Sequence, residues 1–404
     1  MKNKLSVIVF ILQFLVILRA DFNGGAIHIS GEVIKNSGHF RIGDLIKNIE
    51  GLSFNTINGF VYNFSFNALN DYQHQNYSIF IDDHEIFLNL FDLKSINSLP
   101  INANNIDSLV IYTNPRLYKG RFENNGIIQI YTNRRENKKF YFKNRITLGN
   151  ETKDSGPYLY TKYQTPNVDK IGSDYSGTLG TELKGQNLMA SFHLRQNIFT
   201  DWSINKRIHN LTGRDQWPML IQYGGSLILD GTILGNQYSL LLSRVNADNL
   251  YLYSEEIGHE IPLNYINNSI GFSLNRKISE NWFLNSNFNY GNQFANNLMT
   301  KSSLNNYWIQ ENLDYNLEII NKKNTQIKKI GAGFIYRNFS ILQNNPVKNP
   351  FIPRFYFAFN FKSKTLGKIS VQELFNIYQN HIYDNFSFLI SKKINTQNKL
   401  QILL

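Results

Sequence analysis

The chain has 404 residues, no cysteine, 14% aromatic residues and a formal net charge of +11. This length allows more than one domain, and the lack of cysteine excludes a disulfide framework and cysteine-ligated zinc. The basic residues are scattered along the chain rather than gathered in one stripe, so we expect no nucleic-acid partner.

The first 20 residues have the layout of a signal peptide. Lys2 and Lys4 form a basic head, an apolar run extends from Leu5 to Leu18, and Ala20 offers a small residue for cleavage. The run is short for a transmembrane helix, although an N-terminal anchor helix is the alternative. Residues 1–20 are therefore expected to be an export signal, followed by a linker over 21–37.

Residues 38–136 have the pattern of a small mixed α and β domain. Apolar residues at helical spacing predict a helix over 40–49, with Gly51 as a plausible cap at its end. Runs rich in β-branched residues predict strands over 77–83, 106–112 and 126–132.

From residue 137 to 404 the apolar period changes to two. Phe355, Phe357 and Phe359, for example, alternate with Tyr356 and Ala358. Segments of about ten residues with one apolar face are typical of strands that cross a bilayer. The pattern predicts an antiparallel transmembrane β-barrel with strands near 138–149, 174–184, 187–196, 219–230, 236–246, 264–276, 281–290, 306–320, 326–338, 352–363, 368–378 and 384–393.

The connections between these strands alternate in length. Gly185-Gln186 is a tight turn, and 231–235, 277–280, 321–325 and 364–367 are also short. Long polar stretches lie between them, at 150–173, 197–218, 247–263, 291–305 and 339–351. Outer-membrane barrels have short periplasmic turns and long external loops, so this alternation favours a barrel over a soluble β-sandwich.

After about twelve strands only a stub remains, from Leu400 to Leu404, whereas single-chain bacterial barrels have an even number of strands. We expect an incomplete barrel, from a truncated or frameshifted gene or a fragment. The alternative is an error of one or two in the strand count.

The domain at 38–136 resembles the plug of TonB-dependent outer-membrane receptors over about a hundred residues in the same order. A short helix ending in glycine, a strand entering an Asp-containing turn, a Leu-Pro pair, a strand followed by proline, a Leu-Tyr element and a glycine-led last strand all have counterparts. The matching positions include Asp44, Gly51, Asp82, Pro100, Pro115, Gly120 and Gly126.

The resemblance implies a mainly β protein in which a small α+β plug sits inside a barrel in the outer membrane of a Gram-negative bacterium. It also implies a small-molecule ligand and an energy-coupling TonB complex as partners. The chain departs from the family where Asp83 replaces the usual glycine, and no TonB-contacting segment is evident between Asp21 and Gly38. These departures bear on transport rather than on the fold.

The sequence contains no phosphate-binding glycine loop and no His-Glu-x-x-His motif. We therefore expect no catalytic site, no metal site and no cofactor. Glu255, Glu256, His259 and Glu260 are better interpreted as a solvated loop than as metal ligands. Aromatic and arginine residues are enriched in binding surfaces, so the candidate ligand-binding residues are those of loop 197–218, namely Trp202, Arg207, His209, Arg214 and Trp217.

Basic residues at lumen positions need partners or a ligand. Lys143, Arg145, Arg195 and Arg244 are assigned to the lumen, and we expect them to pair with acidic plug residues such as Asp82, Asp83 and Asp92, because buried charges need partners. An anionic ligand is the other explanation.

The leading interpretation is a TonB-dependent receptor-like protein that takes up a small ligand. The first alternative is a truncated or non-transporting outer-membrane barrel with a structural or ligand-binding role. The second is a secreted all-β binding protein.

Overall fold

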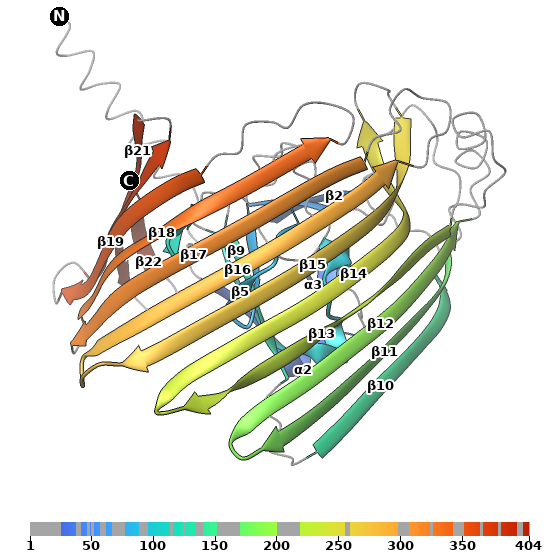
Figure 1. Ribbon diagram of the computed structural model, residues 1–404, viewed down its shortest axis with the longest axis horizontal. Coiled ribbons are helices and arrows are strands. Elements are labelled where there is room, and N and C mark those ends of the chain that lie inside the picture. The colour runs from blue at the N-terminus through green and yellow to red at the C-terminus, as the bar shows by residue number, and fades with distance from the viewer. Residues whose placement is uncertain are drawn as a thin grey trace, which may run out of the picture.

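The computed structural model describes residues 26–37, 42–46, 49, 52–56, 62–66, 77–88, 96–113, 116–123, 126–133, 140–151, 170–199, 219–254, 259–297, 307–323, 326–341, 351–363, 367–378, 381–393 and 399–403. These residues form a long antiparallel sheet, here called the wall, and a small domain, here called the plug, which covers residues 26–133. Figure 1 shows the wall as a curved surface with plug elements such as β5, β9 and α2 behind it.

The wall contains 13 strands, and each strand pairs with its sequence neighbour. They are β10 (Phe140–Glu151), β11 (Lys170–Leu183), β12 (Gln186–Phe199), β13 (Met219–Ile233), β14 (Asn236–Ser254), β15 (His259–Lys277), β16 (Trp282–Asn297), β17 (Tyr307–Lys323), β18 (Gln326–Ile341), β19 (Phe351–Ser363), β20 (Gly367–Tyr378), β21 (His381–Lys393) and β22 (Lys399–Leu403). Among the described strands no pairing joins β10 to β22, so this part of the chain forms an open curved sheet.

The antiparallel sheet predicted from the period of two is confirmed, since the twelve predicted strands correspond to β10–β21. Several strands extend further than predicted at the ends that lead into the long connections. The stub at the end of the chain is a thirteenth short strand, because Lys399–Leu403 pairs with β21. None of the helices in the described ranges is long and apolar enough to cross a membrane.

Two of the short connections are two-residue turns, Lys184-Gly185 and Leu234-Gly235, in which every residue has a positive φ. Such turns match the twist of the strands they join. The tight turn thus begins one residue before the predicted Gly185-Gln186. Glycine at the second position accommodates this backbone without strain.

The plug is built around a five-stranded sheet of order β1-β6-β9-β4-β5. Its strands are β1 (Ala26–Ser30), β4 (Ser78–Ile81), β5 (His84–Glu85), β6 (Ile106–Tyr112) and β9 (Ile127–Thr132). Two hairpins, β2 (Leu52–Thr56) with β3 (Tyr62–Phe66) and β7 (Arg116–Tyr118) with β8 (Arg121–Glu123), accompany helices α2 (Gly31–Asn36) and α3 (Ile42–Ile46), and short 3₁₀ turns lie at Ile96–Ser98 and Ala103–Asn105.

Of the stretch expected to be a linker, 21–37, the described part, 26–37, contributes to the plug. β1 pairs with β6 along its whole length, and Ile34 of α2 is buried in the plug core. Ser30 caps α2, because its hydroxyl accepts a hydrogen bond from the Val33 amide at 3.4 Å. The remaining domain boundaries stay predictions.

The plug core is apolar and extends into the wall. Buried plug residues such as Ile81, Leu109 and Ile128 belong to one cluster that also contains Met189, Ile228 and Leu241 of the wall. The plug therefore shares its hydrophobic core with the inner face of β12–β14.

Candidate functional site: the interface between plug and wall

Alternation along each strand sorts the wall into an inner and an outer face. On β14, Leu241 and Val245 are buried, whereas Leu242 and Arg244 are exposed. Arg244 therefore lies on the outer face with Leu242, and its assignment to the lumen was wrong. The sequence pattern there is ambiguous, because apolar residues occupy both faces of β14.

The other three basic residues face inward, and two of them, Arg195 and Arg145, contact residues other than the plug aspartates. Arg195 Nε donates to Asp174 Oδ2 of the wall at 2.9 Å. Arg145 Nη1 donates to the neutral amide oxygen of Asn104 in the plug at 3.0 Å. Asp174 lies beside Arg195 because of the register between β11 and β12. Spacing along the chain does not reveal this register.

The two acidic plug residues that the structure describes, Asp82 and Asp83, have partners within the plug. Asp82 accepts hydrogen bonds from the backbone and hydroxyl of Thr132. Asp83 accepts from Tyr118 at 3.0 Å and lies 3.4 Å from the Lys119 ammonium. The third acidic residue, Asp92, lies outside the described residues.

Asp82 and Asp83 form the turn between β4 and β5, and both have positive φ, 47° and 74°. This is the two-residue turn in which the family resemblance expected glycine at 83. Aspartate tolerates the left-handed region better than most residues, and the hydrogen bonds of both carboxylates hold it there. Burial raises the pKa of Asp83, but Lys119 and the Tyr118 hydroxyl bring it below the usual value.

The β7–β8 hairpin bridges the plug sheet and the wall. Its turn, Lys119-Gly120, has φ values of 47° and 75°. Lys119 donates to the Asp83 carbonyl at 2.7 Å on one side and to Asn287 of β16 at 3.3 Å on the other. The amide of Leu117 donates to Gln372 of β20 at 2.7 Å.

Arg121, at the start of β8, is the centre of a buried charge cluster. Its guanidinium contacts Glu85, lies 3.4 Å from Glu123 and is 3.8 Å from Asp314 on β17. Burial raises the pKa of Glu85 above its usual value, and the neighbouring carboxylates of Asp314 and Glu123 add to this against the attraction of Arg121.

The cluster continues into the wall through Arg354 of β19, which is fully buried. Its guanidinium donates to both oxygens of Asp314, at 3.0 Å from Nη1 to Oδ2. Arg354 reaches β17 across Gly333 of β18, where an added Cβ would lie 2.2 Å from the Tyr315 carbonyl oxygen. Two arginines and three carboxylates therefore share one site that spans plug and wall.

Close packing occurs where the β5 segment meets β15 and β16. A Cβ added at Gly271 would lie 2.7 Å from His84 Cβ, and one at Gly291 would lie 3.0 Å from Phe87 Cβ. The carbonyl of Phe87 accepts hydrogen bonds from Asn267, at 3.1 Å, and from Gln293. Glycines in the wall therefore make room for the plug.

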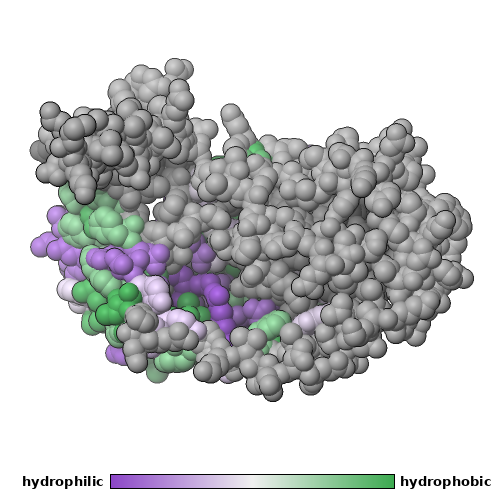
Figure 2. Space-filling view, turned by 90° about the horizontal axis from the view of Figure 1, so that it is seen from above, coloured by the Kyte–Doolittle hydropathy of each residue, from purple (hydrophilic) through white to green (hydrophobic). Residues whose placement is uncertain are grey.

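Polar groups predominate in the contact beyond the shared core. One inward row runs across seven strands, Thr178, Ser191, Ser226, Ser243, Ser269, Gly291 and Asn312, with each member paired to the next. Thr178 accepts a hydrogen bond from Asn105 of the plug. Figure 2 shows hydrophilic residues gathered in the hollow of the visible part.

The residues singled out from sequence lie as follows. Asp82 and Gly120 occupy hairpin turns, Gly126 has a φ of 103° at the start of β9, and Pro100 is buried after the turn at Ile96–Ser98. Asp44 is in α3. The remaining candidates, Gly51, Pro115, Trp202, Arg207, His209, Arg214 and Trp217, lie outside the described residues.

Sequence reasoning missed Arg121, Asp314 and Arg354. The first is a lone arginine in a short hairpin, and the other two are inward residues on strands whose register is not readable from spacing. Within the described ranges, no group of three or more His, Asp or Glu residues is placed to hold a metal ion.

Similar structures have the same combination of plug and wall. The siderophore receptor PirA from Acinetobacter baumannii matches 92% of this chain with a TM-score of 0.68 and 12% identity. The ferric enterobactin receptor PfeA from Pseudomonas aeruginosa matches 93% with a TM-score of 0.68 and 12% identity. The chain has the fold of a TonB-dependent receptor.

The iron transporter FrpB from Neisseria meningitidis is also similar, over 91% of this chain with a TM-score of 0.63 and 9% identity. The chain spans 59%, 61% and 62% of the lengths of these three proteins. No protein-family model matches the sequence, and no curated protein matches it.

Proposed function

We propose that the chain is an outer-membrane receptor of the TonB-dependent type, which takes up a small ligand when its plug moves relative to the wall. The observation that carries this proposal is the charge cluster of Arg121, Glu85 and Asp314, through which the plug is held by polar contacts. When a plug moves, water can replace the hydrogen-bond partners that its polar groups lose. Water cannot replace the contacts of an apolar interface in this way.

Ligand binding is proposed for the long connection 197–218, with Trp202, Arg207, His209, Arg214 and Trp217 as contact residues. Ferric enterobactin, which is named for PfeA, is the first probe to use. Titration should quench tryptophan fluorescence, and Trp202→Phe with Trp217→Phe should remove the quenching, while Trp282→Phe should not. Quenching that survives the double substitution would contradict this site.

The second candidate is a barrel whose plug stays fixed and which binds without transport. It is favoured by the shared core, in which Met189, Ile228 and Leu241 of the wall pack with the plug. Extracting such a plug would expose apolar surface to water.

A plug–wall disulfide separates the two candidates. Because the chain has no cysteine, Phe87→Cys with Gly291→Cys introduces a unique pair, and the 3.0 Å between their Cβ positions is close to the ~3.5–4.5 Å of disulfides. Uptake of radiolabelled ferric enterobactin should be lost on oxidation and restored on reduction. A disulfide within the wall, from Ser191→Cys with Ser226→Cys, should leave uptake unchanged.

Uptake that is the same in the oxidised and reduced plug–wall pair would contradict transport by plug movement. Membrane location is tested independently: the chain should remain in membranes washed with carbonate. A chain that washes off would favour a secreted binding protein.

A further inference from the structure

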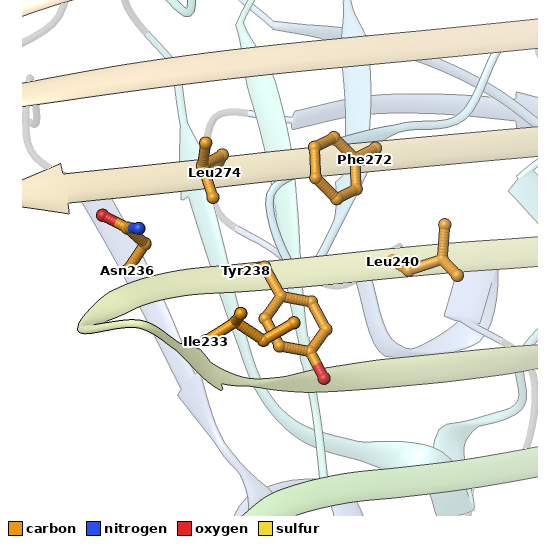
Figure 3. Close-up of a pocket in the computed structure, with 6 residues that line it drawn as sticks. All are labelled: Ile233, Asn236, Tyr238, Leu240, Phe272 and Leu274. Carbon is orange, nitrogen blue, oxygen red and sulfur yellow. The ribbon is translucent and has the colours of Figure 1, made fainter.

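An apolar groove lies on the outer face of the wall beside the Leu234-Gly235 turn. It has a volume of about 310 Å³ and is lined by Ile233, Asn236, Tyr238, Leu240, Phe272 and Leu274 of β13–β15. Figure 3 shows these side chains over three neighbouring strands, with Asn236 at the turn. Ile233 and Phe272 are 53% and 39% exposed, so the groove opens away from the plug.

The groove has the size of a small-molecule site. Its volume is at the lower end of the ~300–1,000 Å³ found for small-molecule sites. Its lining is mostly apolar, with the amide of Asn236 at the turn end and the hydroxyl of Tyr238 further along. An occupant with an apolar chain and a polar end fits this arrangement.

Basic side chains predominate at the short-turn end of the wall, and one of them, Arg276, lies beside the groove. At the short-turn ends of strands β11–β18, including the connections there, the exposed described residues include six basic side chains, Lys184, Arg276, Lys277, Lys322, Lys323 and Lys328, against two acidic ones, Glu182 and Glu280. Arg276 follows Leu274 on the same face of β15, about 7 Å further along the strand. The Lys328 ammonium lies 5.3 Å from the centre of the Phe359 ring.

We propose that this groove binds one acyl chain of an anionic phospholipid, whose phosphate group is held by Arg276 and Asn236. The proposal rests on the membrane location proposed above. It requires that the short-turn end of the wall lies in the membrane leaflet that contains this lipid. Each basic residue near a membrane surface attracts anionic lipid with about 1 kcal/mol, so Arg276 favours a negatively charged headgroup. The apolar lining of the groove contacts only the acyl chain, so its contribution to binding does not depend on the charge of the headgroup.

The test is native mass spectrometry of the full chain in detergent, with phosphatidylglycerol or phosphatidylcholine of the same acyl chains added. We expect the unmodified chain to retain phosphatidylglycerol in preference. Arg276→Gln should reduce this preference about fivefold, as the loss of one basic residue implies. Arg244→Gln, which removes an exposed arginine on the same face of β14 but far from the groove, should leave the preference unchanged.

A groove-filling variant tests the acyl chain separately. Leu240→Trp should lower retention of both phospholipids alike and leave their ratio unchanged. Free glycerol 3-phosphate should fail to displace the lipid, because it has no chain for the groove. Displacement by this compound would show an anion site alone and would overturn the proposal, as would an equal effect of the arginine variants.

Failure of the site and failure of the proposed function give different results. A chain that stays in carbonate-washed membranes but retains both lipids equally would overturn the lipid site alone. A chain that washes off and still prefers phosphatidylglycerol would overturn the membrane location alone. Loss of both properties would overturn both proposals.

Discussion

Arg121 lies among Glu85, Glu123 and Asp314 where the plug meets the wall. Removing one partner from a buried cluster leaves uncompensated charge and typically costs ~3–5 kcal/mol. We expect Arg121→Met to destabilise the docked plug by about that amount. The measurement is the urea concentration at which the plug becomes sensitive to protease while the wall remains protected.

Asn267→Ala is the matched control for this prediction. Asn267 also joins wall to plug, but its amide donates to the neutral carbonyl of Phe87 at 3.1 Å. A hydrogen bond of this kind contributes ~1 kcal/mol, so the shift should be several times smaller. Equal shifts in the two variants would contradict a special role for the charge cluster.

The stability of the β7–β8 hairpin should depend on pH because of Asp83. Its folded pKa is below the usual value, chiefly because of Lys119 and Tyr118 acting against burial. A depressed carboxyl pKa contributes stability that is present above the unfolded value of ~3.9 and is lost as the pH falls through the folded value. We expect hydrogen exchange at β7–β8 to accelerate in that acidic window, and Asp83→Asn to remove the acceleration. An acceleration that persists in Asp83→Asn would assign it to another group.

At the scale of strands and helices, much of the fold could be predicted from the alternation of apolar and polar side chains. It located β10–β21, because one face of each strand contacts apolar surroundings and the other contacts the plug or water. The inner contacts were not accessible in this way, since Asp314 and Arg354 are brought together by register across β18. The reversed assignment of Arg244 has the same cause, because a one-residue change of phase exchanges the two faces.

Gly271 of β15 tests how closely the β5 segment packs on the wall. A Cβ there would lie 2.7 Å from His84 Cβ, so Gly271→Val should push this segment away and weaken docking by ~1–3 kcal/mol, as overpacking does. Asn268→Val, on the outer face of the same strand, is the control. Protease protection of the plug should fall only in the first variant, and an equal fall in both would contradict the contact.

At the scale of the whole molecule, a polar row crosses the outer face of the wall. Its members pair in sequence from β14 to β18: Arg244, Asn268, Asn292, Glu311 and Asn338. Asn338 donates to Glu311 at 3.0 Å, and Tyr290 does so at 3.1 Å. Between this row and the short turns the outer face is mostly apolar, which places the row at the edge of the proposed hydrocarbon layer.

This placement predicts a depth-dependent cost of charge on β16. Arginine on the lipid face of a barrel costs ~2–4 kcal/mol at the membrane midplane and ~0–1 near the interface. Phe288→Arg should therefore destabilise folding into lipid vesicles by a few kcal/mol more than Asn292→Arg. Equal costs, measured by urea titration in the vesicles, would contradict the assigned boundary.

The inward row of Thr178, the four serines and Gly291 has a mechanical consequence. Apart from Phe87 of the plug, which fills the space at Gly291, a surface that slides along this row meets only small side chains, whereas a displacement across the row must pass the bulkier Met189, Ile228 and Leu241. Resistance of the plug to force should therefore be anisotropic. A pull directed along the row would shear the plug at a lower rupture force than a pull of equal loading rate directed along the strands.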